Sequence, residues 1–147
     1  MRRSFGTERG QSTVEMALML PVLLLLLIGT VDVGIAVNAY VTVTNAAREA
    51  TQYAVSHPTA APSAIVSAAT SRSAPLRIDD MNVAVTYYDG SAFQTWPQTG
   101  LASGSPSATK WPVRVEVTYP WSASTILIGD LVRDVTFRGS STMVVAW

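Results

Sequence analysis

The N-terminal third of the chain contains one long apolar stretch. Residues 16–31, MALMLPVLLLLLIGTV, carry no charge, and the next charge along the chain is Asp32. A helix needs ~20 mainly apolar residues to cross the ~30 Å hydrocarbon core of a bilayer, and Val14–Val33 meets this requirement with Glu15 and Asp32 near the two interfaces. Five successive leucines in a soluble core helix would need apolar cover on every side, and a chain this short has little to provide it. The pattern therefore predicts a membrane-inserted helix.

The helical pattern continues beyond this stretch and becomes amphipathic. Apolar residues recur every three or four positions along one face, and polar residues follow another face. The apolar face contains Ile35, Ala39, Val43, Ala46, Ala50, Tyr53 and Ala54. We expect one continuous helix from about Ser12 to Val55, ~65 Å long at ~1.5 Å per residue. His57-Pro58 ends it.

In the C-terminal half the period changes to two, which is typical of strands. Before the change, residues 63–72 form an alanine-rich pattern that predicts a short helix. Alternating apolar and polar positions then predict strands at 83–88, 113–119 and 135–147, the last with a bulge at Gly139. Residues 91–111 are rich in Gly, Ser, Thr and Pro and indicate a long exposed connection, while 125–134 indicate a short apolar helix or docking loop. The tryptophans are spread through this region. We expect them to anchor the core or line the loop rather than to make adhesive contacts.

These elements predict an α+β fold. A long N-terminal transmembrane and amphipathic helix packs on a small antiparallel β-sheet, which spans about residues 82–147. The helix from 36 to 55 and the sheet together make a domain over residues 36–147.

The charges that flank the apolar stretch set its direction. Three arginines lie before the stretch, whereas the charges that follow it include two acidic residues. The basic residues are Arg2, Arg3 and Arg9, and the following charges are Asp32, Arg48 and Glu49. Because positively charged flanks stay in the cytoplasm, we expect the N-terminus inside and everything after about residue 35 across a bacterial-type cytoplasmic membrane.

Composition removes most kinds of chemistry. Ten basic and ten acidic side chains cancel, so there is no global attraction to nucleic acid. The chain has no cysteine and one histidine, His57, which excludes thiol catalysis and a histidine-centred metal cage. Asp79-Asp80 lacks further spaced ligands for calcium, and no serine has a partner base. We therefore expect no enzyme activity, no metal, no cofactor and no nucleic-acid partner.

The junction before the apolar stretch contains a glycine, four residues and a glutamate: Gly10-Gln11-Ser12-Thr13-Val14-Glu15. After an arginine-containing segment and before a hydrophobic helix, this pattern resembles the leader of prepilins. The resemblance implies that a prepilin peptidase cuts between Gly10 and Gln11, leaving a 1–10 leader and an 11–35 transmembrane segment. The alternative is an ordinary secretory signal peptide cleaved after Ala39, although the apolar stretch is longer than the usual ~7–15 residues.

In such a helix, we expect Glu15 to pair with a cation. A carboxylate at the edge of a bilayer segment is costly unless it is paired, and the new α-amino group of a neighbouring subunit is a suitable cation. The simpler alternative is an interfacial acid near the helix N-terminus, with Ser12 or Thr13 as the cap.

A longer resemblance covers the first 57 residues. The chain resembles the TadE-like pseudopilins of the tight-adherence (Flp-type) pilus system through Gly10, Glu15, Leu20-Pro21, Asp32, the 45–50 segment NAAREA and Tyr53-Ala54. It departs from that branch at Met16, where an aromatic residue usually follows the glutamate. The resemblance implies a minor pilin or pseudopilin that supports pilus assembly, with prepilin peptidase, other pilins and inner-membrane lipid as partners and the membrane or the extracellular pilus as its location. The alternatives are another type IV pilin or secretion pseudopilin, or a membrane-anchored or secreted binding domain released by signal peptidase.

Two further residues interrupt the apolar stretch. Pro21 frees a carbonyl and predicts a helix kink, which is either a flexible point used during extraction from the bilayer or a tolerated kink without a role. Asp32 either pairs with a partner subunit at an interface or marks the outer membrane boundary.

Overall fold

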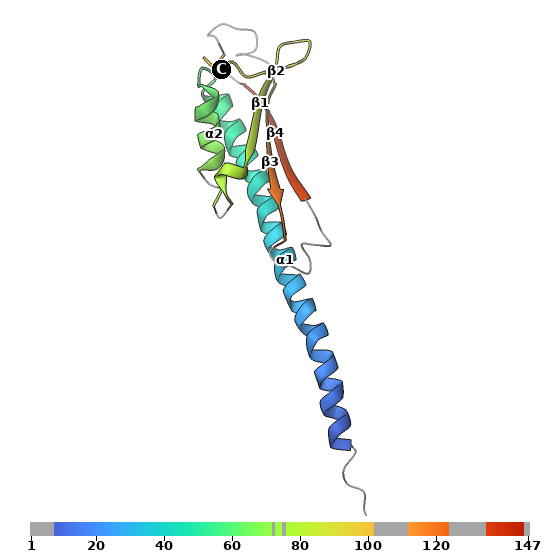
Figure 1. The fold of residues 1–147 in the computed structure, drawn as a ribbon. Coiled ribbons are helices and arrows are strands. Elements are labelled where there is room, and N and C mark those ends of the chain that lie inside the picture. Colours follow the sequence, from blue (N-terminus) through green and yellow to red (C-terminus); the bar gives the residue numbers. More distant parts are fainter. Residues whose placement is uncertain (1–7, 72, 75, 102–111, 124–134, 146–147) are drawn as a thin grey trace, which may run out of the picture.

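The structure, a computed structural model, describes residues 8–71, 73–74, 76–101, 112–123 and 135–145. Its helices are α1 (Glu8–Ser56), α2 (Pro62–Thr70) and the 3-10 turn η1 (Ile78–Asp80), and its strands are β1 (Asn82–Tyr88), β2 (Phe93–Thr95), β3 (Pro112–Trp121) and β4 (Val135–Val144). Figure 1 shows α1 as a shaft, with α2 and the sheet along its C-terminal half and the N-terminal half projecting away from them. The predicted α+β fold is confirmed.

Helix α1 is 49 residues long and runs through Pro21 without interruption. At ~1.5 Å per residue it measures ~74 Å. The predicted continuous helix is confirmed, and it begins one turn earlier than expected. After Ser56 the chain leaves the helix at His57-Pro58, where the His57 N–H still donates to the Tyr53 carbonyl at 2.9 Å.

The four strands form one antiparallel sheet in the order β2-β1-β3-β4. Strand β3 lies at the centre, and its alternate residues Val113, Val115 and Val117 are fully buried. They face α1, whereas the intervening side chains of β3 are exposed or half-buried. The strands predicted from the period of two are therefore present, with slightly different bounds, and the predicted helix at 63–72 is α2 at Pro62–Thr70.

The helix and the sheet approach closely because small side chains lie between them. The buried face of α1 contains Ala39, Val43, Ala46, Ala47, Ala50 and Ala54. Opposite this face, a Cβ added at Gly139 would come within 2.7 Å of the Val43 carbonyl oxygen and 2.9 Å of the Thr44 Cα. Strand β4 pairs with β3 in an unbroken register on both sides of Gly139, so the predicted bulge is wrong. This glycine is required by the contact with the helix.

In the described part of the connection predicted at 91–111, residues 91–101, only some side chains are exposed. It includes β2, which continues the sheet beside β1, and Trp96, which is 3% exposed. The Trp96 Nε1–H donates to the Ala60 carbonyl at 3.0 Å, and the Leu101 N–H donates to the Pro58 carbonyl at 2.7 Å. These bonds tie the segment to the loop between α1 and α2, and Trp96 belongs to the buried core, so it is a core anchor, as predicted. The element predicted at 125–134, Trp111 and Trp147 lie outside the described residues.

Candidate functional site

The predicted processing site lies in the first turns of α1. Gly10 and Gln11 are both exposed, and a Cβ added at Gly10 would meet no atom within 4 Å. Nothing in the fold of the chain therefore demands a glycine at this position. A need for glycine here would come from another molecule that reads this segment, and cleavage after Gly10 stays a prediction.

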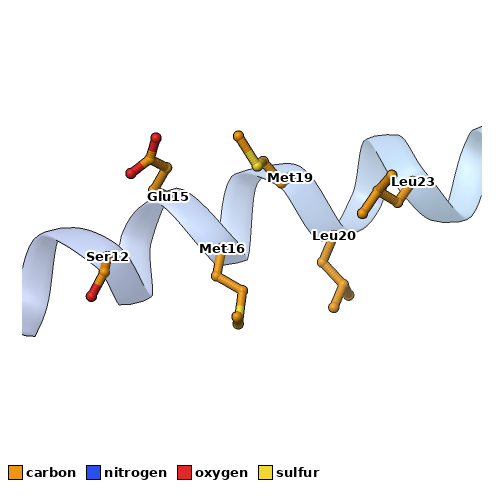
Figure 2. Close-up of a pocket in the computed structure, with 6 residues that line it drawn as sticks. All are labelled: Ser12, Glu15, Met16, Met19, Leu20 and Leu23. Carbon is orange, nitrogen blue, oxygen red and sulfur yellow. The ribbon is translucent and has the colours of Figure 1, made fainter.

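Glu15 lies one turn further along the exposed shaft. Figure 2 shows Glu15 and Met19 projecting to one side of the helix and Ser12, Met16 and Leu20 to another. Within the described residues, Glu15 has no hydrogen-bond or ion-pair partner. Ser12 lies inside a helix that begins at Glu8, so with residues 1–10 attached neither Ser12 nor Thr13 is the N-terminal cap. The arrangement is a single carboxylate among apolar side chains, which is suited to receiving one cation.

The shaft beyond Glu15 has the properties of a membrane anchor. Its large apolar side chains are exposed from Val14 to Val41. Among the described residues, α1 is long and apolar enough to cross a bilayer. An apolar surface of this extent is covered by lipid or protein in the functional molecule.

Asp32, at the outer end of the apolar stretch, is 4% exposed. It lies on the same face of α1 as Ala39 and Val43, and its side chain interacts within the chain. A pairing of Asp32 with a second subunit stays a prediction and would require this cover to open. Pro21 is exposed on the shaft, and a role for it as a kink also stays a prediction.

Three aromatic rings meet at the end of the sheet where β3 ends and β4 begins. The sequence pattern did not predict this cluster. The centroid of the Tyr40 ring on α1 lies 6.1 Å from the centroid of the Phe137 ring on β4. The centroid of the Trp121 ring, at the end of β3, lies 5.8 Å from that of Phe137. Trp121 follows the predicted strand at 113–119, and Phe137 lies in the predicted strand at 135–147, so both were visible in the sequence. Their meeting with Tyr40 depends on how the strands align with the helix, which the sequence pattern does not contain.

The polar face of the sheet carries surface interactions between charged and aromatic side chains. Arg138 and Glu116 form an exposed ion pair at 3.1 Å across β3 and β4. The Arg114 guanidinium lies 4.1 Å from the centre of the Phe93 ring. In the part of the chain that the structure describes, no three potential metal ligands come together.

Comparison with protein families gives a match that lies within α1. Residues 10–52 match the family model described as TadE-like protein. The match begins at Gly10, includes Glu15, Pro21 and Asp32, and ends near the end of α1, before the sheet. No curated protein and no solved structure matches the chain. The family resemblance seen in the sequence motifs is confirmed.

Proposed function

We propose that this chain, whose residues 10–52 match the TadE-like family model, is a minor pilin or pseudopilin that supports assembly of a tight-adherence pilus. The observation that carries the proposal is Glu15, an exposed carboxylate without a partner among the described residues, at the start of a long exposed apolar helix. The family suggests a pilus-related protein, and the apolar helix suggests anchoring in a membrane. The role as an assembly subunit rests on what Glu15 does there.

The proposed mechanism begins with cleavage after Gly10 by a prepilin peptidase on the cytoplasmic side. The new amino terminus is then Gln11, four residues before Glu15, or ~6 Å along the helix. In an apolar environment the α-amino group of a neighbouring subunit attracts the Glu15 carboxylate far more strongly than in water. This attraction sets the axial position of one subunit on the next, while the C-terminal domain stays on the extracytoplasmic side.

The competing cleavage by an ordinary signal peptidase is disfavoured by packing. The bond after Ala39 lies inside α1, and Ala39 is 2% exposed. Cleavage there would remove the first turns of α1 that pack in the domain, including the Asp32 position. Cleavage after Gly10 leaves all of these contacts in place.

The test replaces Glu15 in the full-length chain, expressed with its peptidase and pilus genes. For Glu15→Ala we expect normal processing and membrane insertion, because the change removes a charge from an exposed helix position. We expect piliation to fall strongly. Met19→Leu, one turn further on the same side of the helix, is the matched control and leaves piliation unchanged.

N-terminal sequencing of the purified proteins is read alongside piliation. A start at Gln11 supports prepilin processing, a start at Tyr40 supports ordinary signal cleavage, and an intact Met1 indicates a plain anchored protein. Normal piliation with Glu15→Ala would remove the pairing role, whatever the processing result.

A further inference from the structure

The aromatic cluster formed by Tyr40, Trp121 and Phe137 continues the exposed apolar surface of the shaft. Tyr40 is 51% exposed, and Trp121 and Phe137 are half-buried. The rings pack with one another in tilted and edge-on geometry, at interplanar angles of 37° and 72°. They therefore form one patch. The end of β3 and the start of β4, which carry Trp121 and Phe137, lie at the end of the sheet nearest the free part of α1 (Figure 1).

The position of this patch along α1 follows from the pairing. Phe137 lies beside Tyr40. Trp121 pairs with Val135, which is two residues further along β4 toward the exposed N-terminal half of α1. At ~3.3 Å per strand residue, Trp121 lies ~7 Å below Phe137, level with about residue 35 of the helix. From Glu15 to that level is ~20 residues or ~30 Å, which equals the thickness of the hydrocarbon core. With Glu15 at the inner interface, the cluster reaches the outer one.

The neighbouring surface suits a lipid environment at that depth. Val33, Val37 and Val41 lie on the same stretch of α1, and all three are exposed. Asp32, the charge nearest this level on the helix, is almost completely covered. Sinking this part of α1 to the lipid boundary therefore does not place an open carboxylate of the described helix residues against hydrocarbon.

We propose that the cluster of Tyr40, Trp121 and Phe137 seats the base of the C-terminal domain in the outer interfacial layer of the bilayer. The partner is a lipid surface, because Trp and Tyr combine an apolar ring with a polar group that suits the headgroup level. The patch is also continuous with the surface that the bilayer covers on α1. The inference rests on the membrane anchoring in the proposed function and adds a second contact, which holds the domain against the membrane before the subunit leaves it.

The test uses full-length protein in phosphatidylcholine vesicles whose acyl chains are brominated near the headgroup, which quenches nearby tryptophan fluorescence. We compare a variant that keeps only Trp121 with one that keeps only Trp96, the other tryptophans being replaced by Phe. Trp96 is the matched control because it is buried, hydrogen-bonded to Ala60 and located at the far end of the sheet. We expect quenching about twofold or more greater for Trp121, since interfacial aromatic residues lie at the depth of the bromine atoms.

A single substitution avoids dependence on these multiple replacements. In W121F, with all other tryptophans present, we expect the fraction of fluorescence quenched by brominated lipid to fall. Vesicle flotation separates the two proposals. Protein that floats with equal quenching in wild type and W121F overturns the seating and leaves the anchor intact, whereas protein that fails to float overturns both. Trp121 that responds to subunit dilution but not to brominated lipid would assign the cluster to a second copy of the chain.

Discussion

Gly10 and Gly139 occupy opposite environments. An added Cβ at Gly10 has open space around it, whereas at Gly139 it would press on the backbone of Val43 and Thr44. The motif around Gly10 and Glu15 could be predicted from the sequence because its residues are neighbours in the chain. The reason for Gly139 could not, because it depends on the distance between a strand and a helix almost a hundred residues away in sequence.

We predict that Gly139→Ala destabilises the domain. The methyl group would meet helix backbone, which cannot rotate away as a side chain can, so the sheet and α1 must separate. Overpacking of this kind costs about 1–3 kcal/mol of unfolding free energy. The measurement is urea unfolding of the full chain in detergent, followed by tryptophan fluorescence.

Gly34→Ala is the matched control for this prediction, because an added Cβ at Gly34 also meets nothing within 4 Å. Ala is the better helix former by about 1 kcal/mol, so the control should unfold at equal or higher urea concentration. Equal stability of Gly139→Ala and wild type would show that the helix and sheet have room to move apart.

At the scale of elements, the strongly periodic segments were predictable and the short irregular ones were not. The alanine face of α1 and the alternating valines of β3 each repeat over many residues, so the buried faces were visible in the sequence. Strand β2 is three residues long and follows a turn in a Gly- and Ser-containing segment. Its place in the sheet is set by the turn at Asp89, whose hydrogen bonds only the folded structure shows.

Asp89 holds the β1–β2 turn through its carboxylate. Oδ1 accepts hydrogen bonds from the Ala92 N–H at 2.9 Å and from the N–H and hydroxyl of Ser91 at 2.8 and 2.7 Å. Oδ2 accepts from the Gln94 amide at 3.0 Å. These donors, led by the Ala92 and Ser91 backbone groups, lower the pKa of Asp89 well below its ordinary value of 3.8. The folded state therefore favours the ionised carboxylate.

We predict that Asp89→Ala lowers stability in a pH-dependent manner. A carboxyl whose pKa is lower in the folded chain stabilises it above the ordinary pKa, and this contribution declines as the pH falls below 3.8. The gap in urea midpoint between wild type and Asp89→Ala should be largest at neutral pH and narrow below that value. Asp79→Ala, an exposed acid in η1, is the control. A gap that is the same at neutral and acid pH would contradict a role for the charge.

At the scale of the whole molecule, the chain joins two parts with different surroundings. The shaft exposes apolar side chains over most of its length, while the domain buries its apolar residues between α1 and the sheet. The sequence predicted this division because the uncharged run and the alternating strands occupy separate segments. It did not predict how far the sheet extends along α1, and this extent brings Trp121 level with the end of the apolar stretch.

The last prediction tests whether anchoring and folding are separable. Leu24 is exposed near the middle of the apolar stretch, so Leu24→Arg places a charge at the centre of the bilayer, at a cost of about 2.5–3.5 kcal/mol on insertion scales. We expect the variant to become extractable from membranes by alkaline carbonate. Its domain should still unfold at the wild-type urea midpoint in detergent, because the side chain lies two turns before the first buried residue of α1, Asp32. Asn38→Arg makes the same change at an exposed position beyond the apolar stretch and should remain membrane-bound, since arginine is tolerated at the interface. Carbonate-resistant Leu24→Arg would mean that α1 is held in the membrane fraction by protein rather than by lipid.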